Sequence, residues 1–325
     1  MIRLAVLVAA TLLLTSGLLR AAADDLSAVQ QQFEAGNYAG AMNTLRALVS
    51  QDPSSAAGHF WLGRCYYETR DYKNAALELE KATQLNPNSS DYHDWLGRAY
   101  GGEAAQQRSF LLARRVKKEF QAAVQEDSSN VAARRDLEEY LLEAPWIVGG
   151  SKDDALAQVN AIAQTDPVQG HLAKAEYESA LGKADLAVEE YTAALSLKPP
   201  SIEPYLEVAN YYGLKGEGPQ VTGLVDQAAQ VSPRDARLPF YRGVAHIISG
   251  TNFPVAEENL KSYLASSPER SDWPSHSMAR YWLGQLYEKQ GNKMAAAEQY
   301  RDAVGLDSDN REAKRALSQL EKSLH

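Results

Sequence analysis

Small and large apolar residues recur four and then three positions apart along much of the chain. Ala75, Leu79 and Ala82 follow this spacing, and Pro87 comes shortly after them. On a helix with 3.6 residues per turn, positions at this spacing share one face. Proline then ends the helix, because it lacks a backbone N–H and disfavours helix in the residue before it. The pattern therefore predicts short amphipathic helices separated by proline breaks.

A second motif precedes several of these helices. Trp-Leu-Gly occurs at 61–63, 95–97 and 282–284, each time with a tyrosine three residues after the glycine, and the first two copies are 34 residues apart. The whole unit is helix, tight turn, helix and breaker. Glycine in the first helix and alanines in the second allow the two helices to approach closely, but one such hairpin cannot bury its own apolar face. The motif predicts a stack of hairpins.

The units resemble tetratricopeptide repeats (TPRs), which carry Leu-Gly, Tyr, Ala, a large residue, Ala and Pro at this spacing. The resemblance implies an all-α, right-handed superhelix with a concave and a convex face, in which the first helices line the concave side. The predicted units are 24–53, 56–87, 90–128, 131–167, 168–199, 202–233, 237–268 and 277–308, followed by a polar capping helix at 309–325.

Three insertions depart from the repeat: one between Tyr100 and Val116, one at 144–150 and one at 269–276. The second contains the apolar run Trp146, Ile147 and Val148 in a predicted turn. This run either folds back to fill a gap between hairpins, contacts a ligand as a binding loop, or mediates self-association. The surrounding Leu-Leu-x-Ala-Pro-x-Ile-Val-Gly-Gly resembles an insertion in exported bacterial TPR proteins, which implies a bacterial source.

The first 23 residues have the layout of a secretory signal peptide. Arg3 precedes an uncharged apolar run, and Ala21-Ala22-Ala23 offers small residues for cleavage before Asp24. We expect export to the periplasm or the exterior, with an uncleaved anchor as the alternative. After cleavage we expect no membrane insertion, because no later segment is long and apolar enough to span a bilayer.

Charge and composition narrow the functional classes. The formal net charge is −9, and it becomes −11 without residues 1–23, with 31 basic against 42 acidic residues. An acidic chain repels nucleic acid and anionic membranes, although local basic patches remain possible. Cys65 is the only cysteine, and the six histidines form no metal-ligand motif. We therefore predict no enzymatic activity, no cofactor and no metal site.

The predicted concave face carries the candidate binding residues. Arg64 and Arg98 occupy equivalent positions in neighbouring units, with Arg135 nearby, and could receive carboxylates of a peptide as a basic stripe. The alternative is that they form salt bridges with Glu68, Asp91, Asp94 or Glu139. The tyrosines expected to add contact area are Tyr67, Tyr205, Tyr212, Tyr241 and Tyr281.

The resulting functional hypothesis is a non-enzymatic scaffold that binds a protein or peptide in the concave groove. The alternatives are an assembly or secretion factor of a cell-envelope complex and a self-assembling structural protein. The sequence leaves the partner and the oligomeric state open.

Overall fold

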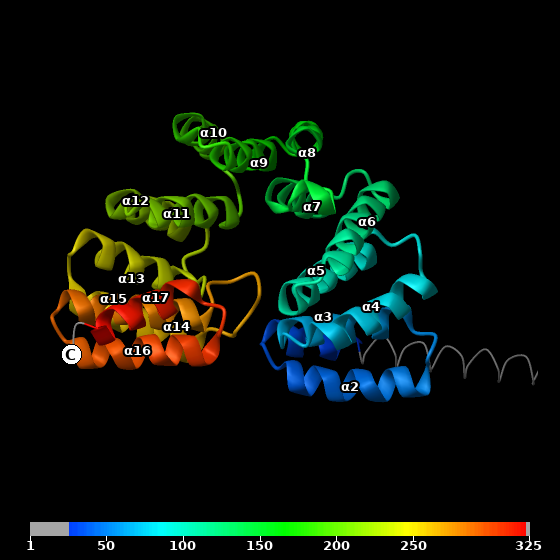
Figure 1. Cartoon of the computed structure of the whole chain (residues 1–325), viewed down its shortest axis with the longest axis horizontal. Helices are drawn as coiled ribbons and strands as arrows, with labels where there is room; N and C mark the ends of the chain where they lie inside the picture. Colours follow the sequence, from blue (N-terminus) through cyan, green and yellow to red (C-terminus); the bar gives the residue numbers. More distant parts are fainter. Residues whose placement is uncertain (1–25, 323–325) are drawn as a thin grey trace, which may run out of the picture. The chain divides into compact units, whose positions relative to one another are not determined.

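The computed structural model describes residues 26–322, in which every regular element is a helix (Figure 1). The predicted signal peptide lies outside the described residues. The elements are a helical segment at 26–34, α2 (Tyr38–Gln51), α3 (Ala56–Glu68), α4 (Tyr72–Leu85), α5 (Ser90–Gln107), α6 (Phe110–Glu126), α7 (Val131–Glu143), the 3₁₀ helix η1 (Trp146–Val148), α8 (Lys152–Thr165), α9 (Pro167–Ala180), α10 (Ala184–Ser196), α11 (Glu203–Lys215), α12 (Gly218–Val231), α13 (Leu238–Ser249), α14 (Phe253–Ser266), α15 (His276–Lys289), α16 (Lys293–Leu306) and α17 (Arg311–Lys322).

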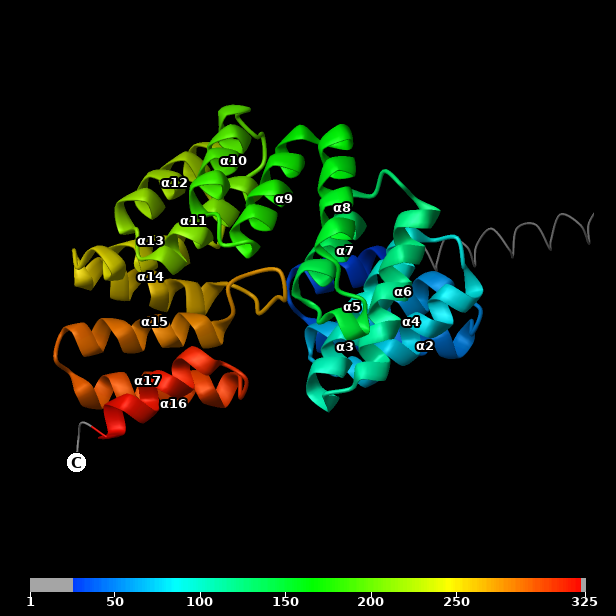
Figure 2. The same cartoon turned by 45° about the horizontal axis from the view of Figure 1, so that its top comes forward.

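Consecutive helices pair into eight hairpins, from 26–34 with α2 through α15 with α16, and α17 packs on the last pair (Figure 2). Ala313 and Leu320 of α17 are buried in that contact. The predicted all-α architecture of eight hairpins and a capping helix is therefore confirmed. Within 26–322, no helix combines the length and apolar character needed to cross a membrane.

Polar side chains fix where many helices begin. Ser55 accepts a hydrogen bond from the backbone N–H of Gly58 (3.2 Å), and Ser89 accepts one from Tyr92 (3.4 Å). These side chains satisfy N–H groups that have no partner within the helix. The breaker segments thus both end one helix and start the next.

The chain forms two compact units, Met1–Asp166 (unit 1) and Pro167–His325 (unit 2). In unit 1 the first helices of successive hairpins are neighbours, α3 with α5 and α5 with α7, whereas α4 and α6 are not. In unit 2 the same holds for the row α9, α11, α13, α15 and α17. The first helices therefore line the inner face within each unit, as the resemblance implies.

Helical glycines set the distance between the two helices of a hairpin. A Cβ atom on Gly63 would lie 2.6 Å from Cγ of Leu79 and 3.2 Å from the carbonyl oxygen of Ala75. A Cβ atom on Gly243 of α13 would lie 2.7 Å from Cγ of Leu260. The contacts with the two leucines are too short for a methyl group, so the leucine or the helix must shift if either glycine is replaced.

The insertions lengthen or join the hairpins. The first one extends both helices of a hairpin, since α5 has 18 residues and α6 has 17, and Arg108 ends α5 in a left-handed conformation (φ 51°). The third forms the connection before α15, in which Trp273 lies near the guanidinium groups of Arg237 (5.4 Å) and Arg270 (5.2 Å). The Tyr263 hydroxyl donates to the carbonyl of Pro274 and holds this connection against α14.

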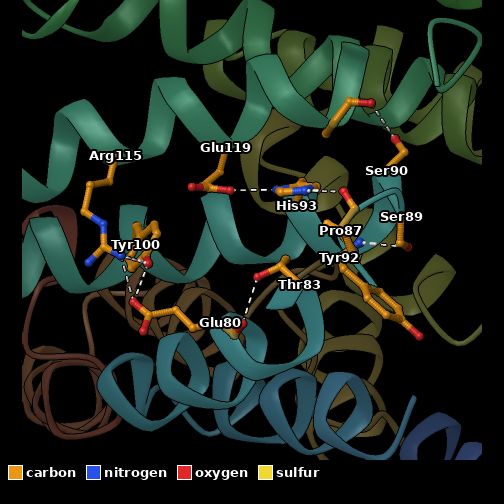
Figure 3. Close-up of polar contacts among 11 residues, drawn as sticks. Glu80, Thr83, Pro87, Ser89, Ser90, Tyr92, His93, Tyr100, Arg115 and Glu119 are labelled. Atoms are coloured by element: carbon orange, nitrogen blue, oxygen red, sulfur yellow. Dashed lines mark hydrogen bonds and ion pairs between the residues drawn. The ribbon is translucent and has the colours of Figure 1, made fainter. Parts of the chain in front are cut away.

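His93 links the hairpin of α5 and α6 to the turn before it, and we call its two contacts the His93 clasp (Figure 3). Nδ1 of His93 lies 2.7 Å from Oε2 of Glu119, and Nε2 lies 2.9 Å from the carbonyl oxygen of Pro87. The hydrogen bond to Glu119 is the main reason why the pKa of His93 is raised. Because both nitrogens face acceptors, only the doubly protonated ring donates to each of them.

The same geometry recurs in the preceding hairpin. Nδ1 of His59 lies 2.6 Å from Glu78, and Nε2 lies 3.1 Å from the carbonyl oxygen of Pro53. In a third hairpin, Nδ1 of His171 lies 2.6 Å from Glu190. These histidines link the helices of their own hairpins.

Replacing Gly243 by alanine should test the close helix contact. We expect Gly243→Ala to lower the free energy of unfolding by about 1–3 kcal/mol, because the methyl group forces α13 and α14 apart. The matched variant is Gly223→Ala in α12 of the same unit, where a Cβ meets nothing within 4 Å. That variant should gain about 0.5–1 kcal/mol from helix propensity. If both variants change the free energy of unfolding, measured with urea, by the same amount, a special role for Gly243 is contradicted.

Removing the His93 clasp should change the pH dependence of stability. A raised folded-state pKa gives stabilisation that is complete below the unfolded pKa of about 6.5 and disappears as pH rises through the folded value. His93→Gln should therefore destabilise the protein more at about pH 5.5 than at about pH 9. We expect a difference on the order of 1 kcal/mol, because solvent screens the partly exposed pair.

The control for this pH experiment is His246→Gln. Nδ1 of His246 lies 3.2 Å from the hydroxyl of Thr251 rather than near a carboxylate. Urea unfolding of both variants over the pH range provides the measurement. A destabilisation by His93→Gln that does not vary with pH would exclude the charged clasp.

Candidate protein-binding site

The inner face of unit 1 is made of α3, α5 and α7, and it carries the predicted stripe. Arg64 and Tyr67 lie on α3, Arg98 on α5 and Arg135 on α7. All four side chains are partly exposed. Since α3, α5 and α7 are neighbours in turn, the structure places the four residues along one row of helices.

Arg64 is held by aromatic rings. Its guanidinium carbon lies 4.5 Å from the ring centre of Trp61 on its own helix and 4.3 Å from that of Trp95 on α5. It also lies 4.5 Å from the ring of Phe33 in the preceding hairpin. Cation–π contacts of this kind fix the plane of the guanidinium. Arg64 is therefore oriented before any ligand arrives.

Arg98 is engaged by acids. Its Nε donates to Oδ2 of Asp94 over 3.1 Å and also contacts the carboxylate of Asp136 on α7. The salt-bridge alternative for Arg98 is thus confirmed for Asp94, and Asp136 is an additional partner that the sequence analysis did not name. Arg98 is consequently less available to an incoming carboxylate than the predicted basic stripe requires.

Asp94, which is buried, and Asp136, which is partly buried, form an acid pair beside Arg98. Burial raises the pKa of both carboxyl groups, and the proximity of Asp94 adds to the rise at Asp136. Two carboxylates this close resist being ionised together. The single guanidinium of Arg98 can therefore neutralise most of the negative charge of Asp94 and Asp136. The central part of the inner face is consequently close to neutral.

Tyr67 completes an aromatic surface on this face. Its ring centre lies 5.4 Å from that of Trp95 and 5.3 Å from that of Tyr72, both in edge-on geometry. Burial raises the pKa of Tyr67 to about 12, so its hydroxyl stays protonated at neutral pH. Arg64, Tyr67 and Trp95 together present a guanidinium, a hydroxyl and an indole on adjacent helices.

The tyrosines of unit 2 only partly fit the prediction. Tyr205 and Tyr241 are buried in the core of unit 2, so the expectation that they contact a ligand is wrong. Each belongs to the core cluster that α11 and α13 form with their neighbouring helices. Tyr281 is half-buried against Trp282 and Tyr300.

Tyr212 borders a hollow of about 440 Å³ in unit 2. Its other walls come from α10, α11 and α12 and include Tyr191, Leu195 and Leu224. The lining of the hollow contains no Asp, Glu, Lys, Arg or His side chain, and it offers mainly apolar contact. It is an additional surface feature that the sequence pattern did not indicate.

The candidate loop divides into two parts. Val148 is buried against unit 1, as the gap-filling hypothesis predicts, and it is therefore unavailable as part of a binding loop. Trp146 and Ile147 are exposed, so the gap-filling hypothesis is wrong for these two residues. The short turn of η1 directs one side chain inward and two outward.

Contacts among α4, α5 and α6 stabilise the packing of these helices. The Tyr100 hydroxyl donates to Glu80, and Arg115 donates to the same carboxylate over 2.8 Å (Figure 3). These residues join α4, α5 and α6, and the repeat pattern does not indicate the contact because Glu80 lies in the hairpin before that of Tyr100 and Arg115. Cys65 is buried, and burial raises the pKa of its thiol to about 12, which makes it unreactive at neutral pH.

Comparison with known proteins points to one family. Residues 32–99 and residues 248–311 each match a family model described as tetratricopeptide repeat. No curated protein gives a significant match.

Solved structures share the fold at low identity. Yeast Tom70 has a TM-score of 0.60 at 14% identity, over 88% of this chain and 58% of that one. A tetratricopeptide repeat protein from Parabacteroides merdae ATCC 43184 has a TM-score of 0.50 at 13% identity, over 93% and 99%. A chain of the APC/C hetero-tetramer Cut9–Hcn1 has a TM-score of 0.51 at 12% identity, and the match covers 91% of this chain and 55% of that one. This chain thus spans little more than half the length of Tom70 and of the Cut9–Hcn1 chain.

These similarities concern the fold alone, and they agree with the helical hairpins, the helical glycines and the two family-model matches. The chain belongs to the tetratricopeptide repeat family, whose fold typically serves as a scaffold for protein–protein interaction.

Proposed function

We propose that the inner face of unit 1 binds an extended segment of another protein and that the chain acts as a non-enzymatic scaffold. The observation that carries this proposal is the arrangement of Arg64, Tyr67 and Trp95 on adjacent first helices. Aromatic residues and arginine are enriched in protein interfaces, especially where binding energy concentrates.

The geometry supports a ligand with a carboxylate next to an apolar or aromatic side chain. Stacking on Trp61 and Trp95 uses the faces of the Arg64 guanidinium and leaves N–H donors in its plane. A carboxylate can accept two of these bonds at once. The Tyr67 and Trp95 rings then provide the neighbouring apolar contact.

The packed helices supply this surface in a preformed state. Arg64 is held by three rings and Arg98 by two acids, so little side-chain freedom remains to be lost on binding. Preformed surfaces bind with a smaller entropic cost. Arg98 contributes in this proposal by keeping α5 and α7 in register rather than by meeting the ligand.

We also propose export of the chain, on the basis of the apolar run and the Ala21-Ala22-Ala23 sequence. Cleavage after Ala23 predicts a mature chain that begins at Asp24. Intact-mass measurement of the protein from a cell-envelope or culture fraction tests this, and a chain that retains residues 1–23 would contradict it.

Photo-crosslinking should locate the binding face. We place a photoreactive phenylalanine analogue at Tyr67 on α3 and, as a matched outer position, at Leu77 on α4, which is partly exposed. The inner position should give an adduct of discrete mass in the cells that produce the protein, and the outer position should not.

The Arg64→Glu variant should then lower the yield of the inner adduct by at least about tenfold, because it replaces two charge-assisted bonds with repulsion. Arg64→Lys serves as the control that keeps the charge and loses the planar fork. Circular dichroism checks that both variants remain helical. An adduct that Arg64→Glu leaves unchanged would exclude this face as the binding site.

A further inference from the structure

Four large apolar side chains are exposed at two turns of unit 1, and we call them the turn patch. Phe110 and Leu111, at the start of α6, are 69% and 75% exposed, and Trp146 and Ile147, in η1, are 84% and 53% exposed. Clusters of exposed apolar residues of this size usually mark a contact surface.

The two turns are fixed against each other. The Arg114 guanidinium donates to the carbonyl of Ile147 over 3.3 Å, and Lys117 donates to that of Gly149 over 2.8 Å. The Tyr140 hydroxyl contacts the carbonyl oxygens of both Ala113 (2.6 Å) and Val148 (2.8 Å). Phe110 lies one helical turn before Arg114, so the turn at the start of α6 is held within about one helical turn of the contact with η1.

The turn patch adjoins a cationic hollow. Arg114, Lys117 and Lys118 of α6 line a hollow of about 320 Å³ together with Trp146 and Ile147. Lys117 is 3.7 Å from Asp154, whereas neither Arg114 nor Lys118 makes an ion pair with any residue in the described range 26–322. Positive charge is therefore concentrated here, on a chain whose formal net charge is −9.

The apolar side chains project from the surface instead of lining a slot. Trp146 retains most of its accessible surface, whereas residues in a peptide groove would be half-buried by the groove walls. Projecting tryptophan, phenylalanine and leucine beside lysine and arginine match the boundary of a bilayer, where aromatic rings sit at headgroup level and cations meet lipid phosphates.

We propose that the turn patch docks the protein on the surface of an anionic phospholipid bilayer. The four apolar side chains enter the boundary between headgroups and acyl chains, and Arg114 and Lys118 contact the lipid phosphates. This contact is peripheral and does not need a membrane-spanning helix. It lies on α6 and η1, so it is independent of the proposed binding face on α3, α5 and α7.

Vesicle co-sedimentation tests the proposal. The protein is the chain that begins at Asp24, which keeps every described residue and removes the apolar N-terminal run as a competing anchor. The probes are phosphatidylcholine vesicles with and without about 30 mol% phosphatidylglycerol. We expect binding to the anionic vesicles, and we expect it to weaken in about 0.5 M salt, which screens charges beyond a few ångström.

Two variants should separate the apolar and ionic contributions. The double variant Trp146→Ser with Ile147→Ser should lower partitioning by about tenfold or more, because it removes two projecting apolar groups. Lys118→Glu should lower it by at least about fivefold, because each lost cation weakens attraction to the anionic surface. The three substituted positions are solvent-exposed, and circular dichroism checks that the variants keep the fold.

The matched controls lie in unit 2. Leu214→Ser removes an apolar side chain that is 81% exposed, and Lys289→Glu reverses an exposed charge. Neither should change partitioning. Absence of binding to anionic vesicles, or equal binding by the patch variants and the controls, would overturn the proposal. Capture of an acidic aromatic peptide without vesicle binding would assign the turn patch to a protein partner instead.

Discussion

The close crossing of two helices at a glycine is the constraint on which the rest of this structure depends. Where α3 meets α4, the backbone of Gly63 lies against Leu79 and the carbonyl of Ala75, with no room for a methyl group. Gly97, Gly243 and Gly284 make comparable crossings in the pairs α5–α6, α13–α14 and α15–α16, and each of these hairpins is a compact pair with one apolar edge. Because the pair cannot bury that edge alone, the next hairpin must cover it, and the first helices become neighbours in a row. The inner face of unit 1 is a consequence of that row.

Polar contacts then fix the hairpins in their places. His93 and His59 each join a first helix to its second helix and to the turn before it, while Arg98 joins α5 to α7 through Asp94 and Asp136. Arg64, Tyr67 and Trp95 are ordered by contacts with one another and stay partly exposed on the inner face. The binding proposal therefore rests on side chains of the inner face that remain partly exposed after the helices have packed.

The repeat pattern was sufficient to predict the fold because it repeats the same local physics: a small residue at the crossing, an apolar face and a breaker. It was less informative about exposure. Tyr205 and Tyr241 occupy first helices, as Tyr67 does, yet neighbouring helices bury them. The repeat pattern does not indicate Asp136 as a partner of Arg98, because Asp136 lies in the next hairpin, beyond the first insertion. The opposite directions of Trp146 and Val148 depend on the 3₁₀ turn of η1, which the sequence did not indicate.

The central claim is that a partner binds on the inner face of unit 1. Hydroxyl-radical footprinting of the protein alone and with its crosslink-identified partner tests it most directly, because it reports the solvent exposure of individual side chains. The account predicts that oxidation of Tyr67 and Trp95 falls when the partner is bound, while oxidation of Leu77 on α4 does not change. Protection confined to α4 and α6, or no protection of Tyr67 and Trp95, would contradict it.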